Sequence, residues 1–408
     1  MKREQLLLEP PANPWLVLTA GQTRDAMAIS DFMLEEGRLN PDPTDTLQKM
    51  STMFVKAGVP LDRTSTIVRL LHAESVASAR TWSRREGTRT FTFPVAADSG
   101  EGYQRSPAAL AHDNKKWVSF NPQTVGDDTF DIVAELRKAG ICGYLCVPIQ
   151  TVDQKNNMFS FATERPSGFN DQDIAFIRAA IPAIAACQEI LVTHRMLHEV
   201  TRMYVGEEPH RRILEGDVHR GGVTRINSAI LFADMRDFTS LTADMSAEDA
   251  TALLNAYYDC VVPAIEGLGG EVLKFIGDGI LAIFRADGEP QRACTRALEA
   301  AQQALAATAD HSEPDIPKFT IGIALHFGLV AYGNVGSGMR LDYTVIGRDV
   351  NLASRVAGLC KDLGEPLLLS KALADQLQNV QLRTCGEQVL KGISGKTEIF
   401  APGEKVSP

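Results

Sequence analysis

One aspartate and one lysine in the C-terminal half of the chain have a type and spacing that could do chemistry. Asp278 lies between two glycines within Gly269–Phe284, where two runs of branched and aromatic residues predict a β-hairpin. An aspartate between glycines can act as a turn former only. Lys274 is harder to explain in this way, because a charge within an apolar strand needs a partner or a ligand.

A second carboxylate, Asp234, follows a predicted buried strand at Ser228–Ala233. If this strand and the hairpin belong to one ferredoxin-like sheet, the strand end lies beside the hairpin tip, so Asp234 and Asp278 meet at one edge. Two carboxylates there repel each other unless a cation lies between them. Mg²⁺ is usually held by one or two carboxylates plus substrate phosphates, so the pair favours two-metal phosphoryl or nucleotidyl transfer. The structural alternative makes Asp234 a helix cap and Asp278 a turn former.

The elements that must position these residues predict an α+β domain from residue 227 to 402. Their order, strand–helix–strand–strand–helix–strand, is typical of a ferredoxin-like, palm-type sheet. A second hairpin is expected around Phe327–Gly328, and further strands end at Lys391 and Phe400. Helices are expected at 247–268, 294–307 and 349–359.

The C-terminal half also carries four stretches in a fixed order: Phe232–Thr239, Leu273–Gly279, Gly333–Gly336 and Tyr343–Arg355. With them, this half resembles the catalytic domain of class III nucleotidyl cyclases, which convert a nucleoside triphosphate to a 3′,5′-cyclic monophosphate and pyrophosphate. The resemblance implies two Mg²⁺ (or Mn²⁺) ions per active site. It assigns these ions to Asp234 and Asp278, with the Met235 carbonyl as a backbone ligand.

The resemblance also implies roles in substrate binding. Asn351 and Arg355 lie at i and i+4 on one helix face. The family uses the asparagine to orient the ribose and the arginine to stabilise charge on the α-phosphate in the transition state. Lys391 matches a lysine that binds the terminal phosphates. Phe238 and Thr239 follow the first metal aspartate and are expected to bind substrate as well.

Base selectivity rests on Lys274 and Thr344. By the resemblance, Lys274 donates a hydrogen bond to adenine N1, and Thr344 stands where many adenylate cyclases have aspartate. Threonine can accept or donate, so it can still serve the adenine amino group. The Lys/Thr pair marks a subgroup often described as bicarbonate-responsive. ATP is the expected substrate. The alternatives are a guanylate cyclase, which would want an acceptor in place of Lys274, and a nucleotide-binding regulator that has lost catalysis.

The family forms antiparallel catalytic dimers in which each site is shared between two chains. The metal carboxylates come from one chain, and Lys274, Thr344, Asn351 and Arg355 come from the other. This chain has both sets, so the resemblance implies a homodimer with two equivalent sites. At a strand rise of roughly 3.3 Å per residue, Lys274 and Asp278 stand about 13 Å apart, which suggests that they serve different nucleotides.

The N-terminal half predicts a separate α+β domain at 44–190, preceded by an extension at 1–43. The predicted order is a helix, three strands, a polar loop passage, a helix, two strands and a long final helix. This order, together with the segment 166–173 before the final helix, resembles a GAF domain, which implies a regulatory sensor. Residues 191–226 are expected to form a helical linker. Its first part continues the apolar spacing of the long helix, which suits a parallel two-stranded helix joining two chains.

A small-molecule ligand is expected for the sensor, although the domain could also serve only as a dimerisation module. Core or loop packing is the alternative for each of the residues that could line its pocket. These residues are Trp82, Tyr103, Trp117, Cys142 and Cys146.

Composition limits the function classes further. The formal net charge of −10 argues against broad binding to nucleic acid or to anionic membranes. No apolar run reaches about 18 residues, so no transmembrane helix and no membrane partner are expected. Seven scattered cysteines show neither a disulfide framework nor zinc-ligand spacing, which indicates a reducing, cytoplasmic setting.

Overall fold

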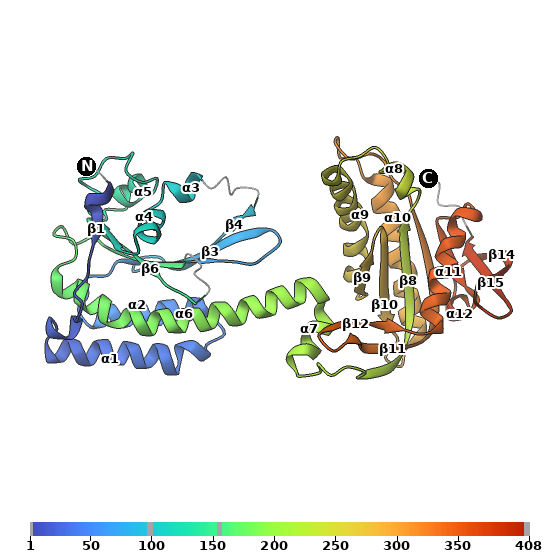
Figure 1. Ribbon diagram of the computed structural model, residues 1–408, viewed down its shortest axis with the longest axis horizontal. Helices are drawn as coiled ribbons and strands as arrows, with labels where there is room; N and C mark the ends of the chain where they lie inside the picture. The colour runs from blue at the N-terminus through green and yellow to red at the C-terminus, as the bar shows by residue number, and fades with distance from the viewer. Residues whose placement is uncertain (1–2, 96–100, 153–156, 404–408) are drawn as a thin grey trace. The chain divides into compact units, whose positions relative to one another are not determined.

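The computed structural model describes residues 3–95, 101–152 and 157–403 (Figure 1). The chain divides into two compact units, Met1–Val200 and Thr201–Pro408. These are called the N-terminal unit and the C-terminal unit below, and each is described by itself.

The N-terminal unit is built on one antiparallel sheet of seven strands. Its first long strand, β2, lies between β7 and β3. The pairing of β2 with β7 therefore joins strands from early and late in the unit near the centre of the sheet. The short strand β5 lies in the passage that the sequence analysis assigned to loops. In spatial order the strands are β1 (Leu7–Leu8), β5 (Trp117–Phe120), β6 (Gly143–Ile149), β7 (Asn157–Thr163), β2 (Arg63–Arg69), β3 (Ser75–Ser83) and β4 (Gly87–Pro94).

Helices cover both faces of this sheet. On one face, α1 (Ala20–Glu35), α2 (Pro43–Lys56) and α6 (Asp171–Val205) enclose an apolar core with β6 and β7. On the other face, α3 (Glu101–Gln104), α4 (Pro107–Asn114) and α5 (Val133–Lys138) pack over a second core. The predicted extension is part of this packing, because Ala26, Ile29 and Met33 of α1 are buried.

Helix α6 is the longest element, with 35 residues. Its first half is buried in the N-terminal unit, whereas Ile190, Leu197 and Tyr204 further along are exposed. Among the described residues, it is the one helix long and apolar enough to cross a membrane by length and composition, and 56% of its apolar stretch is buried inside the protein. A buried core helix meets the same criteria, so the absence of a membrane span stays a prediction.

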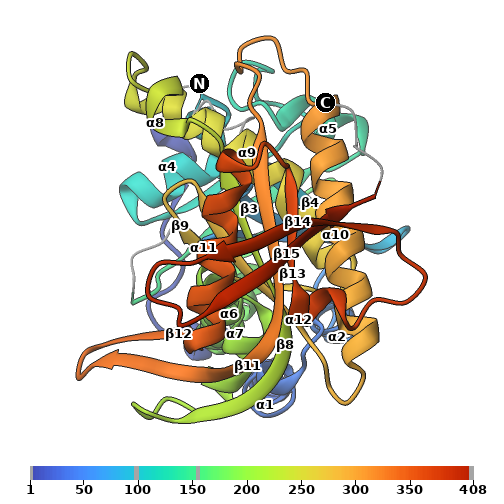
Figure 2. The same ribbon diagram turned by 90° about the vertical axis from the view of Figure 1, so that its right-hand side faces the viewer.

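The C-terminal unit contains an eight-stranded sheet in which four neighbouring strands, ending at one edge, run β11-β8-β10-β9 (Figure 2). This is the spatial order of the predicted ferredoxin-like arrangement, with β8 as its first strand and β11 as its last. Strand β13 joins β11 in parallel, and β12 pairs with the far end of β11. The strands are β8 (Val223–Met235), β9 (Glu271–Ile276), β10 (Gly279–Arg285), β11 (Ile321–Ser337), β12 (Arg340–Ile346), β13 (Leu367–Ser370), β14 (Leu382–Val389) and β15 (Lys396–Pro402).

Alternation along β8 places side chains in cores on both faces of this sheet. Ala229, Leu231 and Ala233 pack under α9 (Ala247–Gly267) and α10 (Pro290–Asp310). Ile230 points to the other face, where α11 (Arg348–Asp362) lies. The short helices of the unit are α7 (Glu207–Leu214), α8 (Phe238–Leu241) and α12 (Lys371–Ala374).

The predicted hairpin at Phe327–Gly328 is wrong, because β11 continues through these residues without a turn. It pairs with β8 from Ile321 to Gly333 in one unbroken register. A glycine is needed at position 328 for a reason other than a turn. A Cβ atom at Gly328 would lie 2.3 Å from Oδ2 and 2.6 Å from Cβ of Asp349, so the first turn of α11 can approach the strand only where no side chain intervenes.

Gly328→Ala should therefore destabilise the C-terminal unit by about 1–3 kcal/mol, the usual cost of forcing extra atoms into a packed site. Gly338→Ala is the matched control, because a Cβ there would meet no atom within 4 Å. All three tryptophans lie at positions 15, 82 and 117 of the N-terminal unit, so the part of the far-ultraviolet circular dichroism transition in urea that tryptophan fluorescence does not share should follow the C-terminal unit. Equal unfolding curves for the two variants would contradict the packing argument.

Candidate active site

The structure brings Asp234 and Asp278 together at one end of the C-terminal sheet. Asp234 is the second-last residue of β8 and pairs with Gly279, the first residue of β10. Asp278 lies in the two-residue turn between β9 and β10, where Gly277 adopts a φ of 62°. The amide of Met235 donates to the Asp278 carbonyl at 3.4 Å, which ties the turn to the strand end.

The electrostatics of this pair fit a bound cation. Burial, and then the charge of Asp278, raise the pKa of Asp234 to about 6. Asp234 keeps a solvent-accessible side, so a cation can reach it. Among the described residues, no cluster of three or more His, Cys, Asp or Glu side chains could hold a metal. Two carboxylates and the neighbouring Met235 carbonyl suit an ion that completes its coordination with water and phosphate oxygens, as Mg²⁺ does.

Tyr258 of α9 holds the turn in place, a role that the sequence analysis missed. Its hydroxyl donates to the Gly277 carbonyl at 2.6 Å, and its ring lies 4.4 Å from the ring of Phe275. Burial and the charge of Asp278 raise the pKa of Tyr258, which keeps the hydroxyl protonated as a donor. Only the pairing of α9 with the hairpin in three dimensions identifies this tyrosine.

The loop after Asp234 is fixed by two neighbouring charged residues. The Arg236 side chain donates to the carbonyls of Cys360, at 3.1 Å, and of Glu365. Asp237 adopts a left-handed conformation with φ of 56° and pairs with Lys361 at 2.6 Å. Helix α8 follows at once. It begins with the predicted substrate residues Phe238, which packs against the core, and Thr239, which is exposed.

Lys274 forms an ion pair with Asp342 of β12, a residue that the sequence analysis did not single out. Both side chains remain partly exposed, at 40% and 47%. Thr344 lies two residues further along β12, hence on the same face, and only 8% of it is exposed. The predicted base-reading pair, Lys274 and Thr344, therefore lies near the Asp342 carboxylate. The sequence gives one signal for Asp342, because strand alternation places it on the same face as Thr344.

The remaining predicted residues are exposed. Asn351 and Arg355 lie one turn apart on α11, and Lys391 lies in the loop between β14 and β15. In the part of the chain that the structure describes, none of these three side chains has a hydrogen-bond or ion-pair partner. They are thus available to a ligand or to another chain.

Within one chain, the start of α11 lies far from the aspartate pair. Asp349, in the first turn of α11, accepts a hydrogen bond from the Leu329 amide at 2.8 Å. Leu329 pairs with Asn227 of β8, which precedes Asp234 by seven residues on that strand. The strand rise places Asn227 and Asp234 roughly 20 Å apart. The structure therefore does not bring Asn351 to the aspartates of the same chain.

The N-terminal unit contains a separate cavity of about 590 Å³ between the sheet and the helices α3 and α4. Tyr103 lines it, together with residues of β2, β3 and β4. The other four residues predicted for a sensor pocket do not line it. Trp82, Trp117 and Cys146 are buried in the cores, as the packing alternative requires, and Cys142 is partly exposed.

Comparison with known proteins gives relatives for the C-terminal unit. Residues 224–401 match the family described as the adenylate and guanylate cyclase catalytic domain. Adenylate cyclase 1 of Rhizobium meliloti (strain 1021) is 31% identical over 205 residues, which cover 48% of this chain and 31% of that protein. An adenylate cyclase of Anabaena cylindrica is 34% identical over 193 residues, which cover 45% of this chain and 38% of that protein. The chain thus spans about a third of the length of these curated relatives.

Solved structures include one of the adenylyl cyclase CyaB from P. aeruginosa, with a TM-score of 0.38 and 26% identity. The match covers 44% of this chain and 94% of that one. The family match at residues 224–401 thus falls within the α+β C-terminal unit.

Asp278→Asn should abolish the stabilisation of the C-terminal unit by Mg²⁺ or Mn²⁺. For the wild type, a free metal concentration of ten times Kd should add about 1.4 kcal/mol to the free energy of unfolding. Without metal, the variant should unfold at an equal or higher temperature than the wild type, because the substitution removes the repulsion that acts on Asp234. Thermal melts by circular dichroism measure both effects.

Asp259→Asn on the exposed face of α9 is the control for this experiment, because it removes the same charge away from the pair. A metal response that persists in Asp278→Asn, or one that is equally lost in Asp259→Asn, would contradict the assignment.

Proposed function

We propose that this chain uses the cyclase catalytic domain at residues 224–401 to convert ATP to 3′,5′-cyclic AMP and pyrophosphate. The juxtaposition of Asp234 and Asp278 beside the strand that carries Lys274 is the observation on which the proposal rests. Two curated relatives named adenylate cyclases support the choice of product. A guanylate cyclase is less favoured, because guanine would need an acceptor at the position of Lys274.

Asp234, Asp278 and the Met235 carbonyl would hold two Mg²⁺ or Mn²⁺ ions per site. Bound ions supply Lewis-acid activation of the ribose 3′-hydroxyl and neutralise charge on the phosphates. The 3′-hydroxyl gives its proton to solvent water and its oxygen forms a bond to the α-phosphorus, and the bond from that phosphorus to the oxygen bridging to the β-phosphate breaks. Pyrophosphate leaves with the electron pair.

The other polar residues of the domain position the nucleotide. Asn351 orients the ribose, and Arg355 donates to the α-phosphate, where negative charge develops in the transition state. Lys391, with Phe238 and Thr239 near the aspartate pair, binds the phosphates. That Asn351, Arg355 and Lys391 are exposed and unpartnered in the described part of the chain supports these roles.

Lys274 and Thr344 read the adenine, with Asp342 as a positioning residue. Asp342 holds the Lys274 ammonium at a defined place on β9, so the lysine side chain loses less freedom when adenine binds. A response to bicarbonate, inferred from Thr344, belongs to the same proposal and would appear in a bicarbonate titration at fixed pH.

A homodimer completes each site. The separation of roughly 20 Å between the start of α11 and Asp234 supports a second chain as the source of Asn351, and Arg355 would come from the same chain as Asn351. Phe275 and Ile276, next to Lys274, are about half exposed, as an apolar interface before assembly would be. On α6, exposed apolar residues recur at intervals of seven at Ile190, Leu197 and Tyr204, which suits a two-stranded helix between chains.

The N-terminal unit acts as a GAF-like sensor of the cyclase. Its antiparallel sheet with helices on both faces and its cavity of about 590 Å³ support a small-molecule ligand, with Tyr103 in the wall. The protein would act in the cytoplasm, where its seven free cysteines stay reduced, and without nucleic-acid or membrane partners.

Purified protein with ATP and Mg²⁺ or Mn²⁺ should form cyclic AMP, resolved by chromatography. Asp234→Ala and Arg355→Ala should each lower the rate at least about 100-fold, the usual effect of removing an electrostatic contact to the transition state. Arg292→Ala, exposed on α10, removes the same charge as Arg355→Ala away from the site and should leave the rate unchanged. No cyclic product from ATP or GTP would contradict both cyclase assignments.

Lys274→Glu should lower the ATP rate and raise the ratio of GTP to ATP turnover by at least about 100-fold, because a site built to hydrogen-bond one base rejects a base that leaves its polar group unpaired. The new carboxylate also faces Asp342, so the ion pair is lost. Lys318→Glu makes the same charge change at an exposed position and should not alter the ratio. An unchanged ratio in Lys274→Glu would show that this residue does not read the base.

A further inference from the structure

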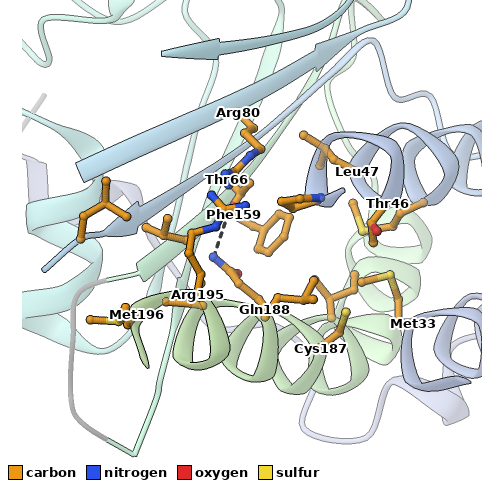
Figure 3. A pocket seen from close by; sticks show the side chains of 17 residues that line it. Met33, Thr46, Leu47, Thr66, Arg80, Phe159, Cys187, Gln188, Arg195 and Met196 are labelled. Atoms are coloured by element: carbon orange, nitrogen blue, oxygen red, sulfur yellow. Dashed lines mark hydrogen bonds between the residues drawn. The ribbon is translucent and has the colours of Figure 1, made fainter. Parts of the chain in front are cut away.

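A smaller cavity of about 60 Å³ lies on the opposite face of the N-terminal sheet from the one assigned to the sensor ligand (Figure 3). Strands β2, β3 and β7 form its floor, and α1, α2 and α6 form its walls. Most of its lining is apolar, including Met33, Leu47 and Phe159. Such a cavity would ordinarily stay dry.

A buried arginine lies in this apolar lining. Arg80 of β3 is 7% exposed, and within the described part of the chain its guanidinium has neither a hydrogen bond nor an ion pair. Burial, and then the charge of Arg195, lower the pKa of Arg80 to about 10, and Asp42 and Glu199 act against this without reaching ion-pair distance. A largely buried charge without an ion-pair partner is costly.

Two residues of α6 add polar groups to the same cavity. Arg195 lines it beside Arg80, and Gln188 lines it two turns earlier on the helix (Figure 3). The Gln188 Nε2 atom donates to Thr66 Oγ1 at 2.9 Å, while its buried Oε1 atom has no partner. Rotation of the amide group would let the Thr66 hydroxyl donate to Oε1 and would free Nε2 as a donor to a ligand.

We propose that this cavity binds a small monocarboxylate through Arg80 and Arg195. A carboxylate matches the planar guanidinium fork and neutralises the buried charge. At about 10–15 Å³ for each water-sized position, the cavity holds on the order of four such positions, which suits an acid of about four to six heavy atoms. A doubly charged phosphate would bring a larger desolvation cost into the same apolar lining.

Occupancy of this site would connect the sheet to α6. The ligand joins Arg80 on β3 to Arg195, which lies near the end of the N-terminal unit. Helix α6 then continues to Val205, so the bound acid restrains the segment that leads into the C-terminal unit. The site is distinct from the larger cavity and does not depend on cyclase activity.

Fluorescence of the full-length protein tests the proposal with sodium propionate as the probe. All three tryptophans lie in the N-terminal unit, and Trp82 lies two residues from Arg80 on the same face of β3. Propionate should bind saturably in the roughly millimolar range, as expected for so few atoms. Propionamide, the neutral analogue, should bind at least about tenfold more weakly, and inorganic phosphate at matched ionic strength should not compete.

Arg80→Met and Arg195→Met should each weaken propionate binding at least about tenfold. Arg80→Met should also raise the unfolding temperature of the ligand-free N-terminal unit, because it replaces an unpartnered charge with an apolar side chain. Arg178→Met, on α6 but outside the cavity, is the matched control and should bind propionate as the wild type does.

The proposal is overturned by equal binding of propionate and propionamide, by tighter binding of phosphate than of propionate, or by no saturable signal with propionate. Unchanged affinity in Arg195→Met would overturn it as well. That variant alters a less buried side chain, so it remains informative if Arg80→Met does not fold.

Discussion

Repulsion between the Asp234 and Asp278 carboxylates is the constraint on which the C-terminal unit depends. The register of β8 with β10 fixes Asp234, and the turn held by Tyr258 fixes Asp278, so neither side chain can move away by a shift of the backbone. The charge of Asp278 contributes to the raised pKa of Asp234. A divalent cation removes this cost, so the fold that brings the aspartates together also creates their affinity for metal.

The same sheet separates the aspartates from the start of α11, which carries the residue that would bind the ribose. Strand β11 runs unbroken along β8, and Gly328 lets α11 approach at the far end. Asn351 is therefore displaced from the Asp234 of its own chain by roughly 20 Å along the strand. This separation supports the proposed homodimer, in which a second copy would supply Asn351 and α6 would carry the regulation.

Much of this could be predicted from sequence, because hydrophobic runs, glycines and charged residues carry local information. The hairpin with Asp278, the strand ending at Asp234 and the ferredoxin-like order all follow from such patterns. The hairpin at Phe327–Gly328 was a wrong prediction, because a glycine needed for helix approach looks like a turn in sequence. Asp342 and Arg80 were missed because their environments arise from strands and helices distant in sequence. In each case a tertiary contact, not a local pattern, determines the role.

The central claim is that each active site is built from two chains, and mixing two inactive variants tests it most directly. Asp234→Ala and Arg355→Ala damage opposite halves of the site, so a mixed dimer contains one doubly damaged site and one intact site. The account predicts that mixing equal amounts restores cyclic AMP formation to about a quarter of the wild-type rate, since half of the dimers are mixed. No recovery after exchange of subunits, verified by light scattering, would contradict it.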